Sequence, residues 1–167
     1  VVSSKIEQKL GGNLRFMISG GAPLAAEIAR FFNALGIPLI EGYGLTEAAP
    51  ILCCNLLEKQ KIGSVGKALP SVTLKMDANG VLFAKGPNIM TSYYNNPDAS
   101  REALKDGWLD TGDMVTIDDE GFVTIVDRKK SLLVLSNGKN VAPLPIEEAI
   151  KRSPYVAQVL VIGVIDS

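Results

Sequence analysis

An alternation of apolar and glycine-rich segments between residues 14 and 43 restricts the fold more than any other feature. The runs LRFMIS and IPLIEGY predict two short strands. Between them, residues 23–35 predict an amphipathic helix, because apolar side chains recur on one face, Pro23 suits a first helical position and Gly36 ends it. A strand, a crossover helix and a second strand usually form one parallel sheet. The sequence therefore predicts a βαβ unit, in which ligands bind at the carboxyl ends of the strands.

The middle of the chain changes to a pattern of hairpins after about residue 62. The segment VTLKMDANGVLFAKG predicts two antiparallel strands with Asn79 and Gly80 in the turn, and MVTIDDEGFVTIV predicts a second hairpin. Between the hairpins, Asn96 followed by Pro97 predicts the capped start of a short helix. We expect this part to form a small antiparallel sheet or barrel.

The run DRKK at residues 127–130 predicts a joint, because four charged residues directly follow a strand. Beyond it, the sequence predicts a strand in SLLVLS, a turn at Asn137 and Gly138, a helix from about Pro145 and a last strand in YVAQVLVIGV.

The predicted fold class is therefore mixed, α/β and α+β. Residues 1–126 are expected to be the C-terminal part of a larger domain, with a βαβ portion of its parallel sheet (1–61) and an antiparallel β subdomain (62–126). Residues 127–167 are expected to begin a small, mobile α+β C-terminal domain.

Histidine is absent from all 167 residues, and this excludes several classes of chemistry. The chain holds no Ser-His-Asp or Cys-His nucleophile system and no His-ligated zinc. Chemistry must use carboxylates, lysines, hydroxyls, backbone amides or a bound cation. A formal net charge of −1 gives no sign of a nucleic-acid partner.

The two cysteines, Cys53 and Cys54, are adjacent. We expect small buried thiols in a reducing compartment, which favours the cytoplasm. The longest apolar run, VAQVLVIGVI, contains a Gln and is too short to span a bilayer. No transmembrane segment is predicted, whereas peripheral membrane association and the oligomeric state stay open.

The stretch GYGLTE follows the second predicted strand and gathers groups suited to a nucleotide. Gly42 and Gly44 leave space around Tyr43, whose ring could stack on a planar base. Thr46 could cap a following helix and face a phosphate, and Glu47 is a hard oxygen ligand suited to Mg²⁺. A capped helix start with a core tyrosine explains the same residues equally well.

Three further positions fit the same ligand. Gly20 and Gly21, in SGGAP, allow close backbone approach or simply a tight turn. Asp113, in GWLDTGD, could bind both hydroxyls of a ribose or be a solvated turn residue. Arg128 could reach a ribose or phosphate, or pair with Asp127 at the surface. Together these residues predict a site for ATP or AMP.

In this order and spacing, YGLTE, GWLDTGD and DRKK with GKNVAP and PIE resemble three core motifs of the adenylate-forming (AMP-binding) superfamily. The resemblance runs from about LRFMISGGAPL to the end of the chain. KGPNIMTSYYNNPDAS and LSNGKNVAPLPIEEAI are most similar to bacterial long-chain fatty acid CoA ligases. The resemblance implies a reaction in two steps. A fatty acid carboxylate attacks the α-phosphate of ATP, giving acyl-AMP and pyrophosphate, and coenzyme A then displaces AMP.

The resemblance also implies a role for each position. Tyr43 would stack on adenine, Thr46 would contact the phosphate, Glu47 would hold Mg²⁺ and Asp113 would bind the ribose hydroxyls. Further nucleotide contacts and the hinge of the small domain would come from a second set of residues: Gly20, Gly21, Ala22, Gly42, Gly44, Arg128 and the hinge Lys130.

Two departures and two alternatives accompany the resemblance. Asn137 stands where the superfamily often has a glycine in its thiolation loop. The superfamily's phosphate loop and its C-terminal catalytic lysine are not found, so we expect an internal segment that is inactive alone. The acceptor could be an acyl carrier protein instead of coenzyme A, or the chain could be a non-catalytic nucleotide-binding module.

Overall fold

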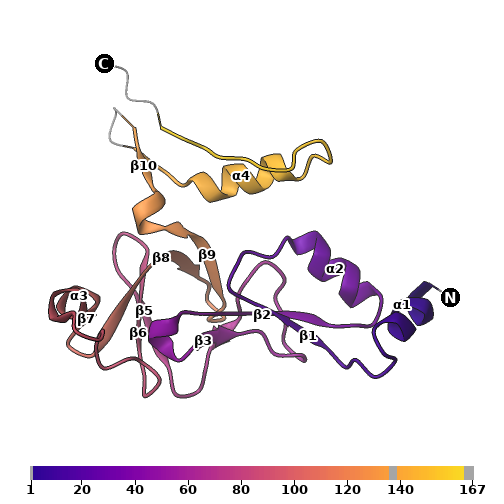
Figure 1. Cartoon of the computed structure of the whole chain (residues 1–167), viewed down its shortest axis with the longest axis horizontal. Coiled ribbons are helices and arrows are strands. Elements are labelled where there is room, and N and C mark those ends of the chain that lie inside the picture. The colour runs from indigo at the N-terminus through magenta and orange to yellow at the C-terminus, as the bar shows by residue number, and fades with distance from the viewer. Residues whose placement is uncertain (1, 136–138, 164–167) are drawn as a thin grey trace.

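The computed structural model describes residues 2–135 and 139–163. Figure 1 shows α2 on one side of a first sheet, a second, antiparallel sheet beside it, and α4 set apart above both. The mixed α/β and α+β class predicted from the sequence is confirmed. In these residues, no helix is long and apolar enough to cross a membrane.

The predicted βαβ unit is present. Helix α1 (Val2–Lys9) is followed by strand β1 (Met17–Ser19), helix α2 (Ala26–Ala34) and strand β2 (Leu39–Gly44), and β1 and β2 pair in parallel. Helix α2 starts later than predicted because Ala25 has an extended backbone.

The start of α2 and its apolar face differ from the prediction. Pro23 lies in the loop before the helix and not at its first position. Only Ala29 is buried among the residues of α2, whereas Ile28 and Phe31 are 46% and 53% exposed. The periodic apolar stripe exists, but within this chain most of it faces outward.

Two strands that were not predicted extend the first sheet. Strand β3 (Ile51–Cys54) pairs antiparallel with β2, and strand β4 (Lys67–Ala68) pairs antiparallel with β3. A single 3-10 turn, η1 (Thr46–Ala48), stands where a helix capped by Thr46 was expected. That expectation is wrong, because Ala49 adopts a left-handed backbone and Pro50 cannot continue a helix.

The second sheet contains the two predicted hairpins. Its strand order is β5-β6-β8-β7, with β9 also paired to β8. The strands are β5 (Thr73–Met76), β6 (Val81–Lys85), β7 (Leu104–Lys105), β8 (Trp108–Ile117) and β9 (Val123–Arg128). The predicted cap of helix α3 (Pro97–Ala103) is confirmed, since Asn96 Oδ1 accepts a hydrogen bond from the Ala99 backbone N–H at 3.1 Å.

The two sheets share one hydrophobic core. Leu52 and Cys53 of β3 pack against Leu82 of β6, and Val115 and Val123 complete the cluster from the second hairpin. Burial raises the pKa of the Cys53 thiol to about 12, so it stays protonated at neutral pH. The prediction of a small buried thiol is confirmed for Cys53.

The region after the joint is less well packed. It contains the 3-10 turn η2 (Lys129–Ser131), the strands β10 (Leu133–Val134) and β11 (Asn140–Val141), and helix α4 (Pro143–Lys151). The turn predicted at residues 137 and 138 lies outside the described residues.

The strand predicted in YVAQVLVIGV is wrong for the described residues 155–163. These residues form no ladder, and Leu160 and Ile162 remain 80% and 68% exposed. An apolar run becomes a strand only where a neighbouring strand offers its backbone groups, and the described sheet here offers edges of only two residues each.

Candidate functional site

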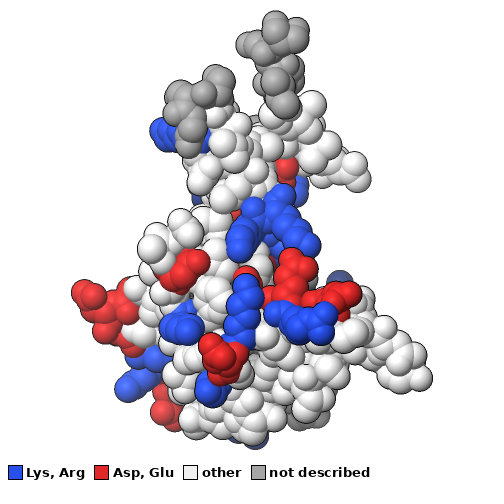
Figure 2. Space-filling view, turned by 90° about the vertical axis from the view of Figure 1, so that its left-hand side faces the viewer, with Lys and Arg blue, Asp and Glu red and all other residues white. Residues whose placement is uncertain are grey.

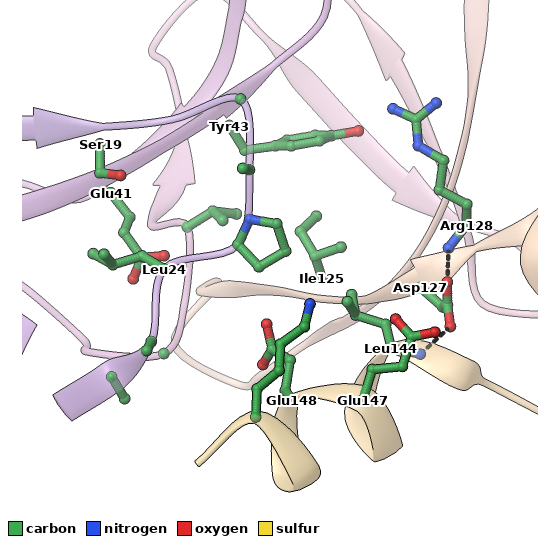
Figure 3. A pocket seen from close by; sticks show the side chains of 18 of the residues that line it. Ser19, Leu24, Glu41, Tyr43, Ile125, Asp127, Arg128, Leu144, Glu147 and Glu148 are labelled. Atoms are coloured by element: carbon green, nitrogen blue, oxygen red, sulfur yellow. Dashed lines mark hydrogen bonds between the residues drawn. The ribbon is translucent and has the colours of Figure 1, made fainter. Parts of the chain in front are cut away.

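A cavity of about 1230 Å³ lies between the two sheets and α4 (Figure 3). One side, here called the strand wall, consists of the carboxyl end of β2 with parts of β8 and β9. The opposite side, the helix wall, consists of α4 and residues 160–161. The loop between β1 and α2 closes a third side. The cavity therefore opens at the end of the parallel strand pair, where the sequence placed a ligand.

Tyr43 and Asp113 meet on the strand wall although they are 70 positions apart in the sequence. The Tyr43 hydroxyl donates a hydrogen bond to Asp113 Oδ2 at 2.5 Å. Burial, and next the contact with Asp113, raise the pKa of Tyr43, so its hydroxyl remains a donor. In Figure 3 the Tyr43 ring is seen nearly edge-on, with one face toward the part of the cavity that holds Ile125.

Arg128 also binds Asp113, and not Asp127 as one reading of the sequence expected. Its Nε lies 3.0 Å from Asp113 Oδ1, and its side chain is 70% exposed whereas that of Asp113 is 4% exposed. Asp113 is thus a buried carboxylate and not a solvated turn residue. Each carboxylate oxygen has two lone pairs, so the cavity-facing carboxylate retains capacity for further donors.

The predicted glycines serve close backbone approach on the strand wall. A Cβ on Gly20 would lie 3.0 Å from the Gly42 carbonyl oxygen, and one on Gly44 would lie 1.7 Å from the Pro50 carbonyl oxygen. Gly21 has φ of +81°, a conformation that favours glycine. Of the predicted loop residues, Gly21, Ala22, Gly42 and Gly44 line the cavity, whereas Gly20 does not.

Thr46 and Glu47 do not line this cavity. Thr46 is exposed in η1, and Glu47 Oε1 accepts a hydrogen bond from the Tyr93 hydroxyl at 2.7 Å. The described residues contain no group of three or more side chains placed to hold a metal ion. Mg²⁺ in nucleotide sites is often bound by one protein carboxylate, with phosphate oxygens and water as the other ligands. Glu47 fits that single-carboxylate role.

Lys130 lies in η2, directly after β9, and is exposed outside the cavity. Sequence reasoning placed the joint here, and the structure has a short 3-10 turn between the second sheet and β10.

Two cavity residues were missed by the sequence interpretation. Glu41 of β2 is 8% exposed and lies in the cavity near Glu148 of α4 (Figure 3). Burial raises the pKa of Glu41, the backbone amides of Gly63 and Leu24 oppose this, and Glu148 adds to it. Asp127, at the end of β9, is 4% exposed. The sequence did contain a signal for each: Glu41 directly precedes the glycine-rich stretch GYG, and Asp127 begins the joint.

The space-filling view supports a mixed-charge surface and not a basic binding face. Figure 2 shows Lys and Arg side chains interspersed with Asp and Glu over the visible side of the molecule. Lys129 Nζ lies 3.7 Å from Asp110 Oδ2, and Lys61 binds Asp118.

Comparisons with known proteins agree on one family. Residues 2–94 match the AMP-binding enzyme family and residues 130–166 match the AMP-binding enzyme C-terminal domain. The chain is 41% identical over 163 residues to a long-chain-fatty-acid–CoA ligase of Yersinia pestis, covering 90% of this chain and 29% of that protein. It is 39% identical over 163 residues to the long-chain-fatty-acid–CoA ligase FadD15 of Mycobacterium bovis, covering 98% and 27%.

The fold agrees as well. o-Succinylbenzoate CoA synthetase of Bacillus subtilis, solved with its acyl-adenylate intermediate, superposes with a TM-score of 0.83 at 29% identity, covering 99% of this chain and 37% of that one. An ATP-bound RpMatB-BxBclM chimera gives a TM-score of 0.82 at 33% identity, covering 90% and 32%. The chain spans between a quarter and two fifths of the length of these proteins.

Proposed function

The chain belongs to the AMP-binding enzyme family, and from this premise we propose that it forms the nucleotide site and joint of a long-chain fatty acid CoA ligase. The contact of Tyr43 and Arg128 with the buried carboxylate of Asp113, on one wall of a large cavity, is the observation that carries the proposal. Relatives named as long-chain fatty acid CoA ligases, at 39% and 41% identity, support the substrate class.

In the proposed complex, ATP or AMP occupies the strand wall. The ring of Tyr43 stacks on adenine, because the hydrogen bond of its hydroxyl to Asp113 fixes the orientation of the ring. Asp113 accepts hydrogen bonds from both ribose hydroxyls through its remaining lone pairs. Arg128 contacts the ribose or phosphate while it neutralises Asp113. The loop residues Gly20, Gly21, Ala22, Gly42 and Gly44 allow the backbone to approach the ligand.

The phosphate end extends toward η1. Thr46 is exposed there and offers its hydroxyl to a phosphate oxygen. Glu47, which also accepts a hydrogen bond from Tyr93, would be the residue that holds a Mg²⁺ ion, and the ion would supply charge neutralisation to the phosphates. The fit of Glu47 is limited to one carboxylate, so phosphate and water must supply the other ligands.

The proposed reaction has two steps. A fatty acid carboxylate oxygen attacks the α-phosphorus of ATP, the bond to the bridging oxygen breaks, and acyl-AMP and pyrophosphate form. The coenzyme A thiol then loses its proton, its sulfur attacks the acyl carbon, and AMP leaves with the electrons of the acyl–oxygen bond. These residues act by orientation and charge stabilisation.

We also propose the division into residues 1–126 and 127–167, with Lys130 in η2 as the hinge between the two steps. Lys130→Pro should spare acyl-AMP formation and impair thioester formation in a complete ligase. Equal loss in both steps would contradict the hinge role.

The absence of the superfamily's phosphate loop and C-terminal lysine from this sequence supports inactivity of the 167 residues alone. The two adjacent cysteines, expected as free thiols, support a cytoplasmic location.

A chimeric ligase tests the proposal. The matching segment of the Yersinia pestis ligase is replaced by these 167 residues, and palmitate-dependent ATP–pyrophosphate exchange and palmitoyl-CoA formation are measured. We expect both activities, and we expect both to fall in the Asp113→Ala chimera. Transfer to acyl carrier protein but not to coenzyme A would favour the carrier-protein ligase. A folded chimera that binds AMP but exchanges no pyrophosphate would favour a non-catalytic module.

A further inference from the structure

The first three residues of helix α4 leave a single backbone donor to be satisfied. The first and third residues of the helix are Pro143 and Pro145, which have no N–H, so Leu144 has the one amide hydrogen among the first three positions. The preceding residue is Ala142, which has no side-chain acceptor to cap the helix. An acceptor for Leu144 must therefore come from another part of the fold.

Asp127, at the end of β9, is that acceptor. Its Oδ2 accepts the Leu144 N–H at 3.0 Å, and its Oδ1 accepts the backbone N–H of Arg128 at 2.6 Å (Figure 3). The residue is 4% exposed, a degree of burial at which an unpaired carboxylate is strongly unfavourable. A carboxylate at a helix N-terminus is also stabilised by the helix dipole. Asp127 thus caps α4 from a strand 17 positions away in the sequence.

Among the described residues, a second polar contact joins the end of α4 to α2, and it is weak. Arg152 Nε lies 4.0 Å from Glu27 Oε1, and these side chains are 74% and 60% exposed. Ion pairs between such exposed groups contribute little. Among the described residues, the bond from Asp127 to Leu144 is therefore the buried polar contact that defines where the helix wall sits.

Asp127 and Arg128 are consecutive residues at the end of β9, and both line the cavity. Arg128 binds Asp113 on the strand wall, and Asp127 binds the start of α4. We propose that Asp127 is a positioning residue that docks the start of α4 over the cavity. The docking stands on these contacts alone, whereas its effect on a ligase reaction rests on the proposed function.

Hydrogen exchange of the Leu144 amide measures the docking directly. Pro143 and Pro145 have no amide hydrogen. Exchange measured at this point of the chain therefore reports on Leu144 and not on either adjacent residue. We expect exchange on the order of tenfold to a hundredfold faster in Asp127→Ala, through loss of a charge-assisted bond. Asp127→Asn retains one acceptor oxygen and should lie between Asp127→Ala and the unaltered chain. The matched control is Asp119→Ala, an exposed carboxylate on the same hairpin, which should leave the rate unchanged.

A distance measurement separates docking from local fraying. Spin labels on Arg30→Cys in α2 and Ala149→Cys in α4, with Cys53→Ala and Cys54→Ser, should give a narrow distribution that broadens in Asp127→Ala. Unchanged exchange and unchanged distances in Asp127→Ala would overturn the proposal. If Asp127→Ala does not fold, Asp127→Asn decides by the same two measurements, and unfolding of both variants would overturn a role confined to α4. Neither readout requires catalysis, so a failure of the proposed function would be seen separately.

Discussion

The strand wall and the helix wall of the same cavity are stabilised in different ways. On the strand wall, Tyr43 and Asp113 are fixed by two sheets that share a core, and Asp113 is 3% exposed. On the helix wall, α4 leaves Ile146 and Ile150 40% and 43% exposed, and in the described part of the chain its neighbouring sheet consists of β10 and β11. The proposed function, in which the cavity holds a nucleotide and the part beyond the joint moves, would be served by one rigid wall and one wall with few fixed contacts.

The largest difference between the walls should appear in stability. Leu82→Ala removes a fully buried side chain from the shared core and should lower the free energy of unfolding by about 2–5 kcal/mol. Ile150→Ala, in the half-exposed face of α4, should lower it by less than about 1 kcal/mol. Urea denaturation of both variants checks the contrast, and equal losses would show that the walls are equally packed.

Removing one hydroxyl from the strand wall should have the next largest effect. Tyr43→Phe leaves Asp113 Oδ2 without its donor at 2.5 Å and should lower the free energy of unfolding by about 1–3 kcal/mol. AMP affinity should fall less than in Asp113→Ala, because the aromatic face remains. Calorimetry with thermal unfolding gives both quantities, and an unchanged melting temperature would argue against a stabilising bond.

Glu41, on the strand wall near Glu148 of α4, should make the stability of the chain depend on pH. Its folded pKa is raised above the unfolded value, chiefly by burial, so the folded state holds this proton more tightly. Its contribution to stability is greatest below the unfolded pKa of about 4.5 and is lost as the pH rises through the raised value. Glu41→Gln should therefore be more stable than the unaltered chain at pH 7, with a smaller difference at pH 4. The opposite order would mean that the amides of Gly63 and Leu24 outweigh burial.

The smallest effect is expected at the exposed pair between α2 and α4. Arg152→Ala should change the free energy of unfolding by no more than about 1 kcal/mol, because the pair is exposed and screened. Glu27→Ala should match it, and the double variant should equal either single one within error. A coupling energy well above 1 kcal/mol would show that this ion pair, and not Asp127, holds the helix wall in place.

Sequence patterns predicted the features that depend on near neighbours. The parallel pair β1 and β2, both hairpins and the Asn96 cap follow from turn residues and periodicity. Pairings that depend on distant partners were not predicted, as shown by β3 on β2 and by the apolar run at 155–163 that finds no strand partner among the described residues.

In the candidate site too, the identity of several residues could be predicted from the sequence, whereas the contacts between distant residues could not. The sequence predicted Tyr43, Asp113 and Arg128 as site residues, and the structure brings these three together. It could not show that Arg128 would bind Asp113 in preference to Asp127, or that Asp127 would accept from Leu144, because both contacts depend on how strands and helix meet. The roles of Thr46 and Glu47, which lie outside the cavity, remain predictions.

Asp113 is proposed to bind the ribose hydroxyls on the strand wall. The direct test compares binding of ATP and 2′,3′-dideoxy-ATP to the chain and to its Asp113→Ala variant. The unaltered chain should bind ATP on the order of 10- to 100-fold more tightly than the analogue, and Asp113→Ala should bind both with nearly the same affinity. Asp113→Asn should be intermediate. Discrimination by Asp113→Ala equal to that of the unaltered chain would rule out ribose binding by Asp113 and leave it as a structural partner of Tyr43 and Arg128 only.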